Sequence, residues 1–406
     1  MSSIFCDPAA YADPARWHDE AARLRRDDPV HLVEEAGYRP FYAVTRHADV
    51  TEVERQHDKF HNTLDAVLQP QAVIDARNAK GAALRTLIHM DGDDHKNYRG
   101  VTAEWFKPAS LRRLERRIAD LAASTVDDML CLGGSCDAAR DVAMNYPLQV
   151  IMSILGVPDS DLPRMLALTQ ELFGSEDPET RRGTTAEEQM EVILDFAMYF
   201  NALTTSRRER PTEDVASVIA NATINGLQLG DLETMSYYVI IASAGHDTTS
   251  SSISGGIEQF ARHPEQWAAL RAEPALVNGA VDEIIRWESP VKHFMRIAQE
   301  DYVLAGTPIA AGESLLMSYW SANRDESFFD EPFTFDIRRR NADRHLAFGT
   351  GLHFCLGAQM ARIEMRSFFA ELARRVETLE LAGEPERTKS TFVSGLRRLP
   401  ITYSAA

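Results

Sequence analysis

The sequence has few cysteines and no excess of positive charge, and both absences narrow its possible functions. Only four cysteines occur in 406 residues, too few for a disulfide framework. Cys131 and Cys136 lack the CxxC spacing and the matching histidines of a zinc site, so we interpret them as small buried residues or bystanders. The net charge of −18 would repel the phosphates of nucleic acids and anionic membrane surfaces. The sequence therefore predicts neither nucleic acid nor membrane as a partner.

Long hydrophobic runs, internal repeats and Gly/Ser linkers are also absent. The first 20 residues contain no apolar stretch long enough for a signal peptide or a membrane anchor. Together with the low cysteine content, this predicts a cytosolic (cytoplasmic) protein. With 44% hydrophobic and 26% charged residues, the composition is that of a globular protein with a large core. Because no linker divides the sequence, we expect residues 1–406 to form one domain.

Most of the chain has the apolar periodicity of helices. Apolar residues three and four apart predict helices over 109–132, 187–206, 265–287 and 358–376. Runs rich in Val, Tyr or Phe predict strands at 31–34 and 41–45, and two apolar runs around a turn predict a hairpin within 302–319. We therefore expect a mainly α fold with small β-sheets at one side. The polar stretch 174–185 is either a solvated loop or a hinge over an entrance.

Residues 348–357, FGTGLHFCLG, have the composition needed to hold a metal-bound thiolate. Such a sulfur must be deprotonated, contacted by backbone N–H groups and shielded from water. Gly349 and Gly351 allow a tight turn before Cys355, and Gly357 lets the backbone lie close to a flat ring. A helix that begins just after the cysteine would direct its positive end at the sulfur.

A second unusual segment lies within a long helix predicted over 231–262, with its first residue as the N-cap and a His-Pro pair as its end. The sequence AGHDTT places a glycine, a carboxylate and two hydroxyl groups inside this apolar pattern. Gly245 weakens the helix, and Thr248 can bond back to a carbonyl one turn earlier, which opens the regular ladder. Alone, the segment fits either a functional site or a helix kinked for packing with Asp247 in a salt bridge.

These two segments together resemble the cytochrome P450 family. FGxGxHxCxG is similar to the haem-binding signature of that family, with all six fixed positions present, and AGxDTT is similar to its oxygen-binding groove. The resemblance implies the cytochrome P450 fold, a triangular prism of helices with haem b (iron protoporphyrin IX) between two long helices. It also implies that Cys355 is the axial metal ligand, covered by Phe348, with Gly349 and Gly357 beside the haem. Such a thiolate favours cleavage of the O–O bond.

The resemblance also gives roles to residues of the long helix. Asp247 would relay protons from solvent, and Thr248 would donate a hydrogen bond to the bound oxygen. Ala244 and Gly245 would leave room for that oxygen beside the haem. The presence of both the acid and the alcohol argues against a peroxide-only enzyme and against a nitric oxide reductase.

Four basic residues match positions at which the family neutralises the haem carboxylates, although each alone fits a surface charge: His95, Arg99, Arg296 and His353. Glu283 and Arg286 match the ExxR motif of the family, in which the i, i+3 spacing allows a bidentate ion pair. Arg339 resembles the third member of that structural network, with Arg338 as the competing choice.

Substrate contacts follow from the same resemblance, although each of these residues also fits ordinary core. The expected pocket residues are all apolar: Ile241, Ala244, Val291, Phe294, Phe392 and Val393. They imply an uncharged, compact hydrophobic substrate. The region 62–86 is expected to supply the lid of the pocket.

No flavin or iron–sulfur segment follows the haem-binding motif, so electrons must come from another protein, which we expect to be a ferredoxin with its ferredoxin reductase. A basic cluster interrupts the acidic chain and offers a docking site for it: Lys107, Arg112, Arg113, Arg116 and Arg117. An exposed basic helix face is the alternative interpretation.

The function favoured by the resemblance is an O2-dependent hydroxylase that inserts one oxygen atom into a C–H bond. The segments AGHDTTSSSISGG, SANRDESFFDEPFTFDI and YADPARWH are most similar to bacterial terpene hydroxylases acting on α-terpineol-like monoterpenes, whose relatives also take alkylbenzenes. A tailoring enzyme that oxidises a steroid or a larger natural product is the second interpretation, which a longer and more polar lid would favour. A non-catalytic haem-binding sensor or carrier is the third, and Asp247 and Thr248 argue against it.

Overall fold

The computed structural model describes residues 3–63, 65–80, 85–173, 186–393 and 395–406, and in these the chain is mainly helical, as predicted. The α-helices are α1 (Pro14–Asp27), α2 (His47–Arg55), α3 (Gln71–Lys80), α4 (Gly92–Ala103), α5 (Pro108–Leu111), α6 (Glu115–Cys131), α7 (Asn145–Leu155), α8 (Leu162–Phe173), α9 (Ala186–Glu209), α10 (Val215–Ala220), α11 (Asp231–Arg262), α12 (Pro264–Ala272), α13 (Val277–Glu288), α14 (Tyr319–Ala322) and α15 (Ala358–Arg375). None of these helices is long and apolar enough to cross a membrane.

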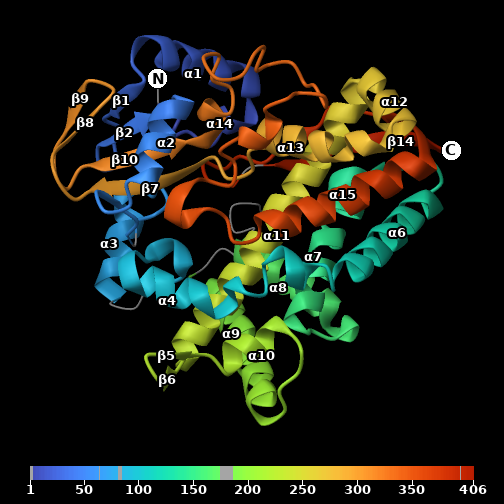
Figure 1. Cartoon of the computed structure of the whole chain (residues 1–406), viewed down its shortest axis with the longest axis horizontal. Helices are drawn as coiled ribbons and strands as arrows, with labels where there is room; N and C mark the ends of the chain where they lie inside the picture. Colours follow the sequence, from blue (N-terminus) through green and yellow to red (C-terminus); the bar gives the residue numbers. More distant parts are fainter. Residues whose placement is uncertain (1–2, 64, 81–84, 174–185, 394) are drawn as a thin grey trace.

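The strands are short, and those of the largest sheet lie at one side of the molecule together with β8 and β9 (Figure 1). β14 lies at the opposite side, and β5 and β6 lie at a third edge, which corrects the expectation that all sheets lie at one side. The largest sheet has the order β1-β2-β10-β7-β3, in which only β2 and β10 are parallel. A second sheet has the order β11-β14-β4, and three two-stranded sheets complete the set. The bounds are β1 (Val30–Val33), β2 (Phe41–Val44), β3 (Phe60–His61), β4 (Ser135–Asp137), β5 (Thr223–Ile224), β6 (Leu227–Gln228), β7 (His293–Ala298), β8 (Tyr302–Leu304), β9 (Thr307–Ile309), β10 (Ser314–Ser318), β11 (Val376–Leu381), β12 (Glu386–Arg387), β13 (Leu396–Arg398) and β14 (Pro400–Ala405).

Three sequence-based boundaries need correction. The hairpin predicted within 302–319 is confined to β8 and β9, whereas β10 pairs with β2 and β7. Leu315, Leu316 and Met317 are all fully buried, and a strand buried on both faces belongs in the middle of a sheet. The helix predicted over 265–287 is two helices, α12 and α13, because Pro274 lacks an N–H group and disfavours helical geometry in the residue before it.

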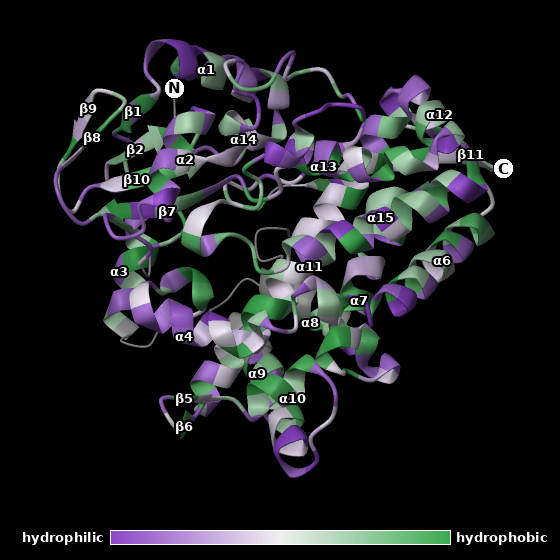
Figure 2. Ribbon diagram, in the orientation of Figure 1, coloured by the Kyte–Doolittle hydropathy of each residue, from purple (hydrophilic) through white to green (hydrophobic). Residues whose placement is uncertain are grey.

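The helix predicted over 109–132 is also divided, into α5 and α6, while the predictions over 187–206 and 358–376 correspond to α9 and α15. α6 carries both green and purple residues along its length, as expected of a helix with one buried face (Figure 2). It packs against α15. The polar stretch 174–185 lies outside the described residues.

The long helix α11 crosses the centre of the molecule and packs against α7 and α13 (Figure 1). It runs without a break from Asp231 to Arg262, the predicted bounds, but its N-cap is Gly230 rather than Asp231. Thr248 does bond back to the Ala244 carbonyl, although the helix remains continuous there. α11 therefore supplies an intact wall for whatever lies beside its centre.

Candidate functional site

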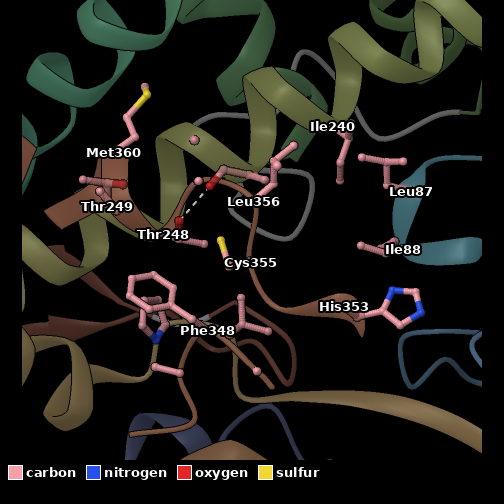
Figure 3. A pocket seen from close by; sticks show the side chains of 18 of the residues that line it. Leu87, Ile88, Ile240, Thr248, Thr249, Phe348, His353, Cys355, Leu356 and Met360 are labelled. Carbon is pink, nitrogen blue, oxygen red and sulfur yellow. Dashed lines mark hydrogen bonds between the residues drawn. The ribbon is translucent and has the colours of Figure 1, made fainter. Parts of the chain in front are cut away.

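A cavity of about 240 Å³ lies between α11 and the loop that precedes α15. The α11 wall consists of Ile240, Ile241, Ala244, Gly245, Thr248, Thr249 and Ser252. The opposite wall consists of Phe348, Gly349, Cys355, Leu356, Gly357, Met360 and Ala361. Figure 3 shows the Cys355 sulfur and the Thr248 side chain facing the same space. The two segments singled out in the sequence thus form the two walls of one cavity.

The loop wall depends on a tight turn before the cysteine. Gly351 has a φ of +71°, and a Cβ atom there would lie 2.4 Å from the backbone oxygen of Glu54. Only glycine fits this position without displacing backbone. The Cys355 N–H donates to the Phe348 carbonyl at 2.9 Å, which closes the loop under the cavity.

The surroundings of the Cys355 sulfur contain several groups that favour a thiolate. Burial raises the pKa of the Cys355 thiol, whereas the N–H groups of Gly357 and Ala358 and the guanidinium groups of Arg99 and Arg362 lower it. The N–H donors lie at the beginning of α15, so the positive end of that helix adjoins the sulfur. A metal cation bound to the sulfur would hold it deprotonated.

One buried polar atom at the edge of the cavity lacks a partner. His95, which is 1% exposed, borders the cavity, and its Nδ1 atom has no hydrogen-bond partner within the described part of the chain. Burial lowers the pKa of His95 to about 4. A haem carboxylate at this edge would give the imidazole the partner that it lacks, and the apolar walls would cover the flat ring. The residues present therefore fit haem b.

The other three predicted basic residues border the same cavity, but each already has a protein partner. Arg99 donates to the Phe354 carbonyl at 2.6 Å. His353 Nε2 lies 3.1 Å from the Asp91 carboxylate, and Arg296 Nη2 donates to Glu54 at 3.0 Å.

The two acidic partners, Asp91 and Glu54, were missed in the sequence. Asp91 lies four residues before His95, a spacing that could have indicated it. Nothing in the sequence near Glu54 points to this site.

The α11 wall carries four of the expected residues, Ile241, Ala244, Gly245 and Thr248. Thr248 Oγ1 donates to the Ala244 carbonyl at 2.7 Å. A Cβ atom on Gly245 would lie 2.7 Å from Cδ1 of Ile151, on α7. The glycine thus makes room for Ile151 and also lines the cavity, and its expected role of leaving room for oxygen stays a prediction.

Asp247 lies beside the cavity but does not line it. Its side chain is 40% exposed, and its Oδ1 atom lies 3.2 Å from Nδ1 of the buried His246. His246 Nε2 lies 2.9 Å from the Met144 carbonyl. Asp247 is therefore positioned between solvent and the helix wall.

The expected substrate contacts divide into two groups. Val291 and Phe294 line the cavity, whereas Phe392 and Val393 do not, which corrects that expectation. Val393 forms a backbone bridge with Val291, and the Phe392 ring lies 5.5 Å from the Phe294 ring. The C-terminal turn therefore packs behind the residues that line the cavity. From the described part of the expected lid, Asn62 lines the cavity, joined by Leu87 and Ile88 just beyond it.

The predicted ion-pair network is present away from the cavity. Arg286 donates to both carboxylate oxygens of Glu283 at 2.7 Å, and both side chains are fully buried. Arg339 donates to the same carboxylate at 3.1 Å, whereas Arg338 pairs with Glu273. Arg339 is thus the third member, as expected, and the network joins α13 to the loop before the cysteine.

A helical fold in which a cysteine, just before the beginning of one helix, faces a largely apolar cavity beside a long helix is that of a haem-thiolate protein. Residues 115–404 match the family described as Cytochrome P450, and the chain belongs to that family. Cytochrome P450-terp from a Pseudomonas species is 40% identical over 412 residues, which cover 98% of this chain and 96% of that protein. Steroid C26-monooxygenase from Mycolicibacterium smegmatis is 34% identical, over 96% of this chain and 91% of that protein. The crystal structure of CYP108D1 from Novosphingobium aromaticivorans superposes with a TM-score of 0.92 at 40% identity, over 99% and 98% of the two chains.

These similarities confirm the predicted family and fold. The chain is a cytochrome P450 monooxygenase with haem b as its cofactor. The interpretation as a non-catalytic haem sensor or carrier is therefore wrong.

Proposed function

We propose that this monooxygenase hydroxylates a small, uncharged hydrophobic molecule, such as a monoterpene or an alkylbenzene. The observation that carries the proposal is the cavity itself, whose α11 wall carries no charged side chain and, apart from the hydroxyl groups of Thr248, Thr249 and Ser252, is apolar and faces Cys355. Ile151, Val291 and Phe294 extend the apolar lining. Such a lining excludes water and binds by burial of apolar surface rather than by ion pairing.

In this proposal Cys355 is the only protein ligand of the haem iron. Phe348, Gly349 and Gly357 lie against the haem. The carboxylates of the haem are held by His95, Arg99, Arg296 and His353, which border the cavity. Bound haem supplies the activation of O2, which no amino-acid side chain provides.

In this proposal Thr248 and Asp247 deliver protons to the cavity. Thr248 donates to the Ala244 carbonyl, so it must turn from that carbonyl when it donates into the cavity. Asp247 is exposed on one side and adjoins Thr248 in the chain, and this position suits a carboxylate that takes protons from solvent. On its buried side Asp247 lies beside His246, whose Nδ1 atom is 3.2 Å from the carboxylate.

Electrons would come from a ferredoxin, reduced by its reductase, that docks on the basic cluster. All five residues of the cluster are exposed, and no carboxylate in the described part of the chain forms an ion pair with Arg112, Arg113 or Arg116. α6, which begins beside them, packs against α15, the helix that follows Cys355. An acidic protein bound here would lie on the cysteine side of the haem, and its association would be steered by charge.

Charge reversal tests this docking site. In Arg112→Glu/Arg113→Glu, we expect the rate of haem reduction by ferredoxin to fall at least several-fold, with a smaller difference at high salt. Arg26→Glu, an exposed residue of α1, is the matched control and should leave the rate unchanged. An unchanged rate in the double variant would remove the docking proposal.

A steroid is the second candidate substrate, because a steroid C26-monooxygenase is 34% identical over nearly the whole chain. Titration of the ferric protein with monoterpenes, alkylbenzenes, fatty acids and steroids, followed through the haem Soret band, separates the two. A shift from low to high spin at micromolar monoterpene or alkylbenzene supports the small substrate. A shift with steroids alone would overturn it.

We further propose that residues 1–406 form one domain and that the enzyme acts in the cytosol. The matches to P450-terp and CYP108D1 extend over nearly the whole of both chains, which supports a single unit. All four cysteines are free thiols, as in proteins of a reducing compartment. Limited proteolysis that releases a stable, independently folded fragment would contradict the single domain.

A further inference from the structure

Glu54 is a buried carboxylate at the edge of the haem cavity that has no place in the proposed function. It belongs to the last turn of α2, is 4% exposed and borders the cavity. Its oxygens accept hydrogen bonds from Arg296 Nη2 at 3.0 Å, from the Tyr319 hydroxyl at 2.5 Å and from the Thr350 N–H at 2.8 Å. A buried carboxylate without such partners would be strongly destabilising.

The three donors come from separate parts of the chain. Arg296 belongs to β7, Tyr319 begins α14, and Thr350 lies in the loop that leads to Cys355. The backbone of Gly351 also passes directly against the backbone oxygen of Glu54. Through Glu54, the loop that carries the cysteine is therefore tied to Arg296, which is proposed to hold a haem carboxylate.

The negative charge of Glu54, in addition to its position, affects the haem site. Burial raises the pKa of Glu54 above its ordinary value, and Arg296, Tyr319 and Thr350 oppose that shift. The Arg296 and Thr350 groups can only donate, and three converging donors suit an ionised carboxylate. Part of the positive charge of Arg296 is thus neutralised by the protein itself, next to the position of the haem.

We propose that Glu54 is a positioning residue of the haem site, which holds the Cys355 loop against Arg296 and makes the bound haem harder to reduce. A negative charge in a buried setting favours the oxidised, more positive state of a nearby iron. The proposal goes beyond the proposed function and needs from it only that haem is bound at Cys355.

The test compares two variants on the same helix in the substrate-free holoenzyme. In Glu54→Gln, we expect the reduction potential of the haem to become more positive and the haem to transfer to apomyoglobin roughly 10-fold faster. Glu52→Gln is the matched control, because Glu52 is exposed and accepts a hydrogen bond from Tyr302 at 2.6 Å. Its loss of charge is screened by solvent, so both quantities should stay at the wild-type value.

Tyr319→Phe tests independently the direction in which the reduction potential of the haem changes. It decides the proposal if Glu54→Gln does not retain haem. This variant removes one donor but keeps the carboxylate, so the charge of Glu54 is less compensated and the potential should become more negative. The proposal is overturned if Glu54→Gln changes the potential no more than Glu52→Gln, or if Tyr319→Phe makes it more positive. A failure of the Cys355 assignment would appear separately, as a wild-type spectrum without thiolate ligation.

Discussion

The two walls of the haem cavity are built in opposite ways. The α11 wall is part of a continuous 32-residue helix, and its side chains reach the cavity at helical spacing. The loop wall combines the first turn of α15 with irregular backbone, in which Gly351 adopts a positive φ and packs against α2. We infer from this difference that the loop wall holds the haem, whereas the α11 wall acts on oxygen and substrate. Substitutions in the two walls should therefore fail in different ways.

The largest effect is expected in the loop wall, from Gly351→Ala. The new Cβ would combine a φ of +71° with a contact of 2.4 Å to the Glu54 backbone. The strained φ alone costs about 1–2 kcal/mol, and the backbone clash adds to it, so most of the bound haem should be lost. The haem-to-protein ratio of the purified variant measures the loss.

Gly306→Ala is the control, because Gly306 also has a positive φ, of +86°, but meets no atom within 4 Å. It should retain its haem. Equal haem content in the two variants would contradict the close packing of the loop wall against α2.

A smaller effect, of another kind, is expected in the α11 wall from Thr248→Ala. The haem should stay bound, since Thr248 does not hold it, while product formed per electron pair falls by roughly a hundredfold, the contribution of a positioned proton donor. The electrons should appear as hydrogen peroxide instead. Product and peroxide are measured against NADH consumed.

Thr248→Ser keeps the hydroxyl group and should restore most of the product. Thr248→Ala could instead lose its haem while its product formed per electron pair stayed at the wild-type value. The assignment of haem binding to one wall and oxygen chemistry to the other would then be wrong.

The smallest effect is expected from Gly357→Ala in the loop wall. A Cβ atom at Gly357 meets nothing within 4 Å in the protein, so the thermal stability of the apoprotein should be unchanged. Haem release should nevertheless be several-fold faster, because the added methyl group occupies space that the ring needs. An unchanged rate of haem release would show that the ring does not approach Gly357.

The sequence predicted the α11 wall better than the regions around it. The bounds of α11 were correct because a long apolar pattern ends at a His-Pro pair. Where periodicity continued across Pro274, one helix was predicted in place of two. Phe392 and Val393 were placed in the pocket by resemblance, but a backbone bridge to Val291 holds their turn behind the lining.

Residues whose contact partners lie far away in the sequence could not be predicted. Glu283 was identified because, with Arg286 three residues away, it matches the ExxR motif of the family in the expected place before the cysteine. Glu54 is also buried and accepts three hydrogen bonds, yet its partners lie 242 to 296 residues away. Only the folded chain brings these groups together, so no local pattern in the sequence marks them.

The central claim, that Cys355 is the thiolate ligand of the haem iron, is tested most directly by the absorption spectrum of the ferrous carbon monoxide complex. We expect the wild-type protein and Cys131→Ser, which changes an exposed cysteine, both to show the Soret position of thiolate-ligated haem. Cys355→Ser should lose that band. A Cys355→Ser spectrum identical to that of the wild type would contradict the assignment.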